Sequence, residues 1–111
     1  MRVTTLVKKL NENLCSLQSS ERWTMYRLVV PVLDCIFGKQ NDRVYFELSI
    51  GNPKVDIGIK GENGKFTSVV EVKKYGSRLA PGQITKYTNS YSFPTPVVLT
   101  NGIDWHFFNC Q

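Results

Sequence analysis

Two acidic residues and a lysine are the side chains best suited to chemistry, because they fall on two neighbouring predicted strands. Asp56 lies in one strand, and Glu71 and Lys73 lie two positions apart in the next. Residues two apart on a strand point to the same face of a sheet. The pair Asn63-Gly64 between the strands is typical of a hairpin turn. If the strands pair as that turn suggests, the faces of Asp56 and Glu71 coincide.

Two carboxylates and an ammonium on one face of a sheet could bind a divalent cation. Neighbouring acids repel each other, and a half-buried pair is costly unless something neutralises it. A hard divalent cation with oxygen ligands does so. Lys73 beside it could then orient or deprotonate an attacking water, or stabilise charge on a phosphate. The alternative is that Asp56, Glu71 and Lys73 form a surface ion pair on the solvent face of the hairpin.

The hydrophobic pattern predicts one mixed α/β domain that would position these residues. Apolar residues at spacings of three and four predict an amphipathic helix over residues 3–17. A second helix is expected from Glu21 to Gly38, with Ser19-Ser20 as its cap, and Pro31 should kink or split it. The pattern then changes to period two, which predicts strands. The expected strands are 43–50, 55–60, 66–73, 97–100 and 105–108, with a helix over 81–90, which gives the order ααβββαββ.

Alternation along the second predicted strand assigns its side chains to faces. Val55, Ile57 and Ile59 should share one face, which leaves Asp56 on the other. The third predicted strand is apolar enough to be central in the sheet. Glu47, on the first predicted strand, is a further acid.

Length and composition restrict the class of protein. The 111 residues suffice for one domain, 1–111, and are too few for two. The three cysteines lie far apart, with no C-x-x-C pair and no His at metal-ligand spacing, which argues against a zinc site and a disulfide framework. The chain has no apolar run long enough to span a membrane and no apolar stretch of a signal peptide at its start. We therefore expect no membrane partner and a cytoplasmic location, in the host if the protein is viral.

The excess of basic residues favours a polyanionic partner. The formal net charge is +5, and the hairpin, the loop after Lys73 and the following helix carry much of the positive charge. If these basic residues surround the opening of one site, they would bind phosphates in a salt-dependent way. Otherwise they form an ordinary solvated surface. The residues are Lys54, Lys60, Lys65, Lys74, Arg78 and Lys86.

Several motifs in a fixed order resemble the PD-(D/E)xK nuclease superfamily. Val55-Asp56, followed after fourteen residues by Glu71-Val72-Lys73, is similar to its bipartite motif, with Val55 in place of the proline. Gln83 and Tyr87 fit the Q-x-x-x-Y helix that follows the catalytic lysine in one group of this superfamily. That group comprises the N-terminal nuclease domains of type I restriction enzyme motor subunits and their small relatives.

Two further features extend the resemblance to residues 21–108. Glu21 lies ten residues before Pro31 on a predicted helix. The closing segments 97–102 and 105–107 are similar to the "LTNG…W.F" end of the same domains. The first helix, within residues 1–19, is outside the resemblance and would be an accessory element.

The resemblance implies a restriction-endonuclease-like core, a mixed sheet flanked by helices, and a metal-dependent endonuclease that hydrolyses DNA phosphodiester bonds. Asp56 and Glu71 would bind Mg²⁺ or Mn²⁺, and Lys73 would be the catalytic lysine that assists water attack. Glu21 would support the metal or a bound water, or serve only as a carboxylate at a helix start.

Gln83 and Tyr87 would position the scissile strand or order Lys73, unless they are an ordinary pair on a helix surface. The same chemistry would serve RNA. We expect a homodimer or docking to a larger protein, and a symmetric dimer would place two active sites on opposite strands. A virus or mobile element is the natural context. The alternative function is a catalytically silent nuclease-fold protein that binds nucleic acid or a partner as a regulator of restriction or defence.

Overall fold

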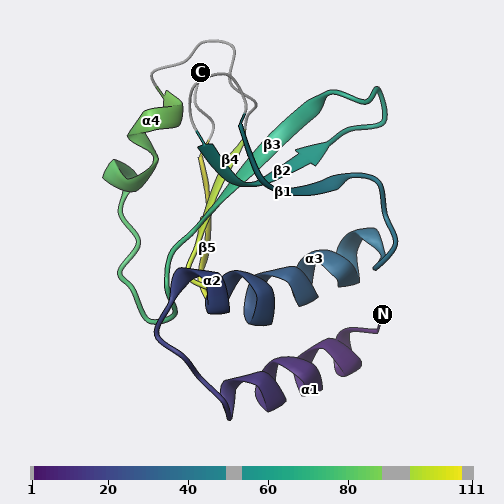
Figure 1. Ribbon diagram of the computed structural model, residues 1–111, viewed down its shortest axis with the longest axis vertical. Helices are drawn as coiled ribbons and strands as arrows, with labels where there is room; N and C mark the ends of the chain where they lie inside the picture. The colour runs from purple at the N-terminus through teal and green to yellow at the C-terminus, as the bar shows by residue number, and fades with distance from the viewer. Residues whose placement is uncertain (1, 50–53, 89–95, 109–111) are drawn as a thin grey trace.

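A five-stranded mixed sheet forms the centre of the computed structural model, which describes residues 2–49, 54–88 and 96–108 (Figure 1). The strands are β1 (Val44–Ser49), β2 (Lys54–Lys60), β3 (Phe66–Val72), β4 (Val97–Thr100) and β5 (Trp105–Phe108). They lie side by side in chain order, and only the β3–β4 pair is parallel. The α/β class, the five strands and the central place of β3 are therefore confirmed. Residue 50, the expected end of the first strand, lies outside the described residues.

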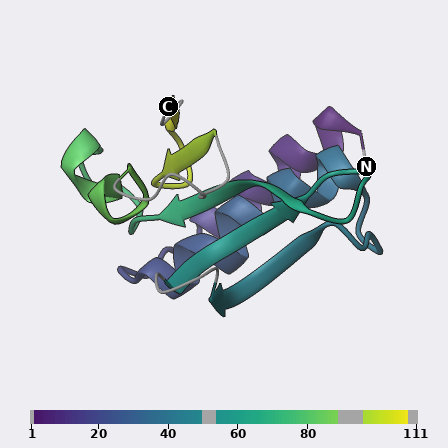
Figure 2. The same cartoon turned by 90° about the horizontal axis from the view of Figure 1, so that it is seen from above.

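The helices before the sheet lie on one side of it, with the first of them packed against the others and farthest from the strands, and the short α4 lies apart from them, on the other side (Figures 1 and 2). They are α1 (Val3–Leu14), α2 (Glu21–Thr24), a π-helical segment (Met25–Val29) and α3 (Val30–Phe37). The predicted cap is confirmed, because the Ser20 hydroxyl accepts a hydrogen bond from the Trp23 N–H. Within the described residues, no helix is both long and apolar enough to cross a membrane.

The second predicted helix is divided into three parts, with a π-helical segment just before Pro31. Proline has no N–H to donate to the carbonyl four residues earlier, so the regular ladder cannot continue there. That carbonyl, of Arg27, accepts a hydrogen bond from the Asn13 side chain of α1 at 2.8 Å. The split at Pro31 was predicted, whereas the π-helical turn and its bond to α1 were not.

The predicted helix over 81–90 differs from the structure. Residues Pro81–Ile84 form a 3₁₀ turn, α4 (Thr85–Thr88) adds one α-helical turn, and residues 89 and 90 lie outside the described part. Pro81 suits the first helical position, but Gly82 directly after it is a poor helix former, and short 3₁₀ turns are common at helix starts. The helical part of the order ααβββαββ is therefore more fragmented than predicted.

Each face of the sheet carries its own apolar core. The face toward the first helices holds Met25, Val29, Leu33, Ile57, Val70, Val72 and Val98. The opposite face holds Val55, Val69, Ile84, Tyr87, Val97 and Leu99. The prediction that Val55 shares a face with Ile57 and Ile59 is therefore wrong. The β1–β2 pairing omits Glu47 and Asp56 at the same place without a change of register, and Glu47 has a backbone φ of 49° between the pairs Phe46–Ile57 and Leu48–Val55.

Candidate functional site

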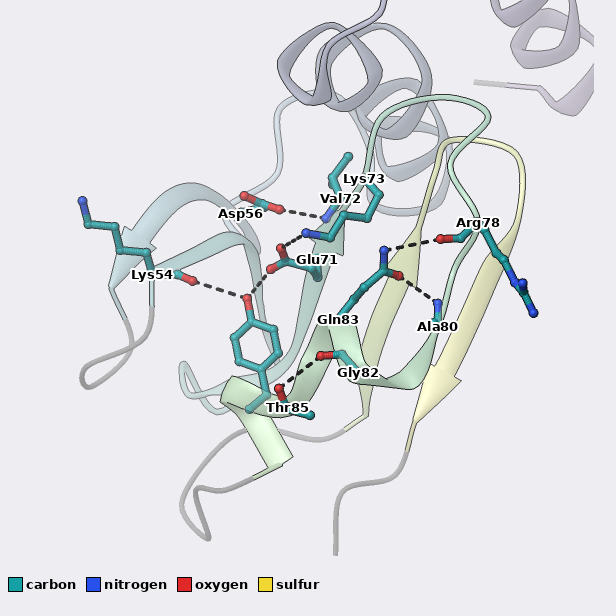
Figure 3. A network of polar contacts seen from close by, with 11 residues as sticks. Lys54, Asp56, Glu71, Val72, Lys73, Arg78, Ala80, Gly82, Gln83 and Thr85 are labelled. Carbon is teal, nitrogen blue, oxygen red and sulfur yellow. Dashed lines mark hydrogen bonds and ion pairs between the residues drawn. The ribbon is translucent and has the colours of Figure 1, made fainter.

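The carboxylate of Asp56 is tied directly to the backbone between Glu71 and Lys73. The Val72 N–H donates a hydrogen bond to Asp56 Oδ2 at 2.8 Å (Figure 3). Backbone pairing between β2 and β3 extends as far as Ile57 and Val70. Beyond this point an acidic side chain, instead of a carbonyl, receives the N–H of Val72. The predicted meeting of the Asp56 strand with the E-x-K segment is thus present.

Glu71 and Lys73 form an ion pair, with Lys73 Nζ 3.3 Å from Glu71 Oε2. This contact confirms that the two side chains share a face. Glu71 is only 5% exposed, and Lys73 is half-buried. The alternative of a solvent-exposed surface pair is therefore wrong for Glu71.

Tyr87 contacts the other oxygen of the same carboxylate. Its hydroxyl donates a hydrogen bond to Glu71 Oε1 at 2.5 Å and lies 3.3 Å from the Lys54 carbonyl oxygen. Burial raises the pKa of the Tyr87 hydroxyl far above its ordinary value, and the bond to Glu71 and the charges of Glu71 and Asp56 add to the rise. Tyr87 is therefore a protonated donor inside the site. The alternative of a helix-surface position is wrong for this residue.

The Gln83 side chain forms hydrogen bonds with the backbone of the loop that precedes it. Its Oε1 accepts a hydrogen bond from the Ala80 N–H at 2.8 Å, and its Nε2 donates to the Arg78 carbonyl at 3.3 Å. The i, i+4 spacing predicted that Gln83 and Tyr87 would point at the same site. Gln83 lies in a 3₁₀ turn, in which side chains three positions apart share a face instead of those four apart. The i, i+4 spacing therefore does not place Gln83 and Tyr87 on one face. Gln83 caps the 3₁₀ turn that precedes α4, and α4 carries Tyr87.

A small pocket opens beside Asp56 on the helix side of the sheet. Its volume is about 180 Å³, and its lining includes three carboxylates. The Glu47 carboxylate also lies 3.8 Å from the Arg22 guanidinium, and both side chains are largely exposed. The lining residues are Glu21, Arg22, Met25, Glu47, Asp56 and Val72.

Glu21 and Asp56 therefore line a common pocket. The support of a metal or bound water by Glu21, which the resemblance implied, stays a prediction. Sequence reasoning did not single out Arg22, although its place directly after Glu21 at a helix start was a usable signal. The face of Glu47 could not be read from alternation, because its left-handed backbone breaks the period of the strand.

The carboxylate chemistry suits a hard cation. Mg²⁺ binds through one or two carboxylates, keeps several waters and accepts substrate phosphate oxygens. Asp56 and Glu71 supply two such groups from adjacent strands. Among the described residues, no group of three or more His, Cys, Asp or Glu is arranged to hold a metal ion. The set of Asp56, Glu71 and Glu21 is therefore not a preformed three-ligand cage.

Comparisons with protein-family models, with curated protein sequences and with solved structures found no match. The relationship to the PD-(D/E)xK superfamily accordingly stays a prediction from the motifs. The geometry of the site has to support any function by itself.

Three basic residues lie at the end of the sheet that carries the site. Lys54 begins β2, and Lys74 and Arg78 lie in the loop after β3; all three are exposed. This loop is anchored where the Tyr75 N–H donates to the Thr24 hydroxyl at 2.8 Å. The side chain of Lys86 lies outside the described part of the structure.

Lys60 lies at the opposite end of β2. The strand length from Lys54 to Lys60 separates the two by roughly 20 Å. The Lys60 ammonium lies 4.5 Å from the centre of the Tyr45 ring and 5.2 Å from that of Phe66. The predicted basic rim therefore includes Lys54, Lys74 and Arg78 but does not extend to Lys60.

Proposed function

We propose that the protein is a divalent-metal-dependent nuclease that hydrolyses phosphodiester bonds of DNA. The observation that carries this proposal is the convergence of Asp56, Glu71 and Lys73 on one short stretch of β3. The Asp56 carboxylate accepts the Val72 N–H, and Lys73 pairs with Glu71. A buried carboxylate beside a lysine at a sheet end is costly for a purely structural purpose.

Asp56 and Glu71 would hold Mg²⁺ or Mn²⁺, with Glu21 at the margin of the pocket. The ion, when bound, supplies an activated water and stabilises charge on the phosphate. Lys73 places an ammonium beside Glu71, from where it can orient the water or contact a phosphate oxygen. Tyr87 stays protonated and holds the Glu71 carboxylate in one orientation.

A restriction-endonuclease-like core belongs to the same proposal. The adjacent Asp56 and Glu71 strands, the mixed sheet and the helices on both faces support it. The proposal extends to DNA as the partner, to a homodimer or docking on a larger protein, and to a cytoplasmic location. The exposed basic residues Lys54, Lys74 and Arg78 support a nucleic-acid partner.

The test is cleavage of labelled linear, nicked, single-stranded and four-way-junction DNA with Mg²⁺, with Mn²⁺ and with EDTA. We expect metal-dependent cleavage that is lost in Glu71→Ala and in Lys73→Ala. The matched control is Glu62→Ala, because the Glu62 side chain is 90% exposed at the far end of the hairpin. Cleavage that survives both substitutions would contradict the proposal.

A catalytically silent binding protein is the second candidate. Both oxygens of Glu71 already have partners, in Tyr87 and Lys73, and this observation favours a structural use of the carboxylate. A silent binder should show no rise in melting temperature with Mn²⁺ that depends on Asp56 and Glu71. A rise that disappears in Asp56→Asn and Glu71→Gln favours the nuclease.

A further inference from the structure

Arg22, Tyr26 and Phe46 form a row of flat, exposed groups next to the Asp56 pocket. The Arg22 guanidinium lies 5.6 Å from the centre of the Tyr26 ring. The Tyr26 and Phe46 rings lie 6.0 Å apart with their planes tilted by 40°. Arg22 also lines the pocket that contains Asp56. The row of three groups is therefore continuous with the pocket that contains Asp56.

Both aromatic rings expose much of their surface to water. Tyr26 is 37% exposed and Phe46 is 38% exposed. The Arg22 side chain is 77% exposed, so its ion pair with Glu47 is weak and its charge is available to a ligand. Exposed rings next to a guanidinium suit a ligand that has both a flat aromatic part and an anionic part.

From this row we infer a binding site for an unpaired nucleotide, with its base stacked on the row Arg22–Tyr26–Phe46 and its phosphate beside Arg22. The inference rests on the proposed function and names its substrate class as single-stranded or locally unpaired nucleic acid. A base within a duplex hides both faces in the stack, whereas an unpaired base can lie on an aromatic ring or a guanidinium plane. The row would hold the strand next to the carboxylates.

Tyr45 provides a matched control on the opposite face of the sheet. It neighbours Phe46 on β1 and is also 38% exposed. Its ring, however, contacts the Lys60 ammonium and packs edge-on against Phe66 at 5.8 Å. If any exposed aromatic ring bound nucleic acid, substitution of Tyr45 would weaken binding as much as substitution of Phe46. If the stacking site lies next to Asp56, substitution of Tyr45 leaves binding unchanged.

The experiment measures fluorescence anisotropy of labelled strands about 15 nucleotides long, as single-stranded DNA, single-stranded RNA and duplex DNA, with EDTA present. We expect a single strand to bind more tightly than the duplex. Tyr26→Leu and Phe46→Leu keep apolar bulk but remove the ring, and each should weaken that binding at least about fivefold. Tyr45→Leu should leave the affinity unchanged. Phe46→Trp keeps a ring, so it should retain binding, and a stacked base should quench its added fluorescence.

Unchanged affinity in both leucine variants, an equal loss in Tyr45→Leu, or no preference for single strands would overturn the inference. Circular dichroism establishes that each variant is folded, and the Phe46→Trp quench tests stacking without removing a ring. Because EDTA prevents metal-dependent hydrolysis, the two proposals can fail separately. A protein that cleaves DNA but shows no stacking effect overturns only this inference. A protein that stacks bases but never cleaves with metal overturns only the nuclease.

Discussion

The hydroxyl of Tyr87 donates a hydrogen bond to the carboxylate of Glu71, sixteen positions away in the chain, inside the apolar core beneath β3 and β4. Glu71 Oε2 meanwhile faces Lys73 at 3.3 Å. One oxygen of this buried carboxylate thus accepts a hydrogen bond from a neutral hydroxyl, and the other oxygen pairs with a cation. Tyr87 is therefore a positioning residue for Glu71.

Removal of the Tyr87 hydroxyl should destabilise the fold. Tyr87→Phe leaves Glu71 Oε1 without that donor in a buried setting, which should lower the free energy of unfolding by about 1–3 kcal/mol. Urea denaturation measures this change. The control is Tyr26→Phe, since the Tyr26 side chain is partly exposed and its hydroxyl can be solvated by water. Equal stability of wild type and Tyr87→Phe would show that the contact is energetically neutral.

Stability should fall at alkaline pH because of the same hydroxyl. The fold raises the pKa of Tyr87 above its ordinary value of 10.0, so the native state keeps a proton that the unfolded chain loses. This contribution is fully present below the unfolded pKa and decreases as pH rises above it, by up to about 1.4 kcal/mol per pH unit. Denaturation curves at two alkaline pH values measure the slope. Lysines also titrate in this pH range, so the contribution of Tyr87 is the difference in slope between wild type and Tyr87→Phe. Equal slopes of unfolding free energy against pH in the two proteins would contradict the prediction.

Substitution of Asp56 should separate its structural contact from its charge. Asn keeps an oxygen that can accept the Val72 N–H, whereas Ala leaves that buried N–H without its acceptor. We expect Asp56→Ala to lose about 1–3 kcal/mol of unfolding free energy and Asp56→Asn to lose less. Both variants should lose a Mn²⁺-dependent rise in melting temperature, while Glu62→Gln should keep it. A full rise in Asp56→Asn would exclude Asp56 as a ligand.

The basic residues near the site should dominate the salt dependence of DNA binding. Replacement of Lys54 or Lys74 by Gln removes an exposed charge at the site end of the sheet. Each change should reduce the slope of log affinity against log salt by about one. Lys60→Gln should leave the slope unchanged, because Lys60 lies at the far end of β2 against Tyr45. Titrations in EDTA at several KCl concentrations measure the slopes, and an equal effect at Lys60 would mean that DNA covers the whole hairpin.

Local patterns in the sequence were sufficient for the strands and for the pairing of Glu71 with Lys73. Strand alternation and the Asn63-Gly64 turn depend on residues only a few positions apart, so they can be read directly. The cap by Ser20 and the split at Pro31 are equally local properties. Such short-range features are enough to place Asp56 and Glu71 on neighbouring strands.

Tertiary structure alone decided which partners the site residues have. Tyr87 turns toward Glu71 while Gln83 turns toward Ala80, because Gln83 lies in a 3₁₀ turn and Tyr87 lies in the α-helical turn that follows it. Asp56 accepts the Val72 N–H where backbone pairing between β2 and β3 ends, and Glu47 adopts a left-handed backbone opposite it. Contacts of this kind join residues that are distant in the chain. Their geometry depends on how the two cores pack against the sheet, which no periodicity in the sequence encodes.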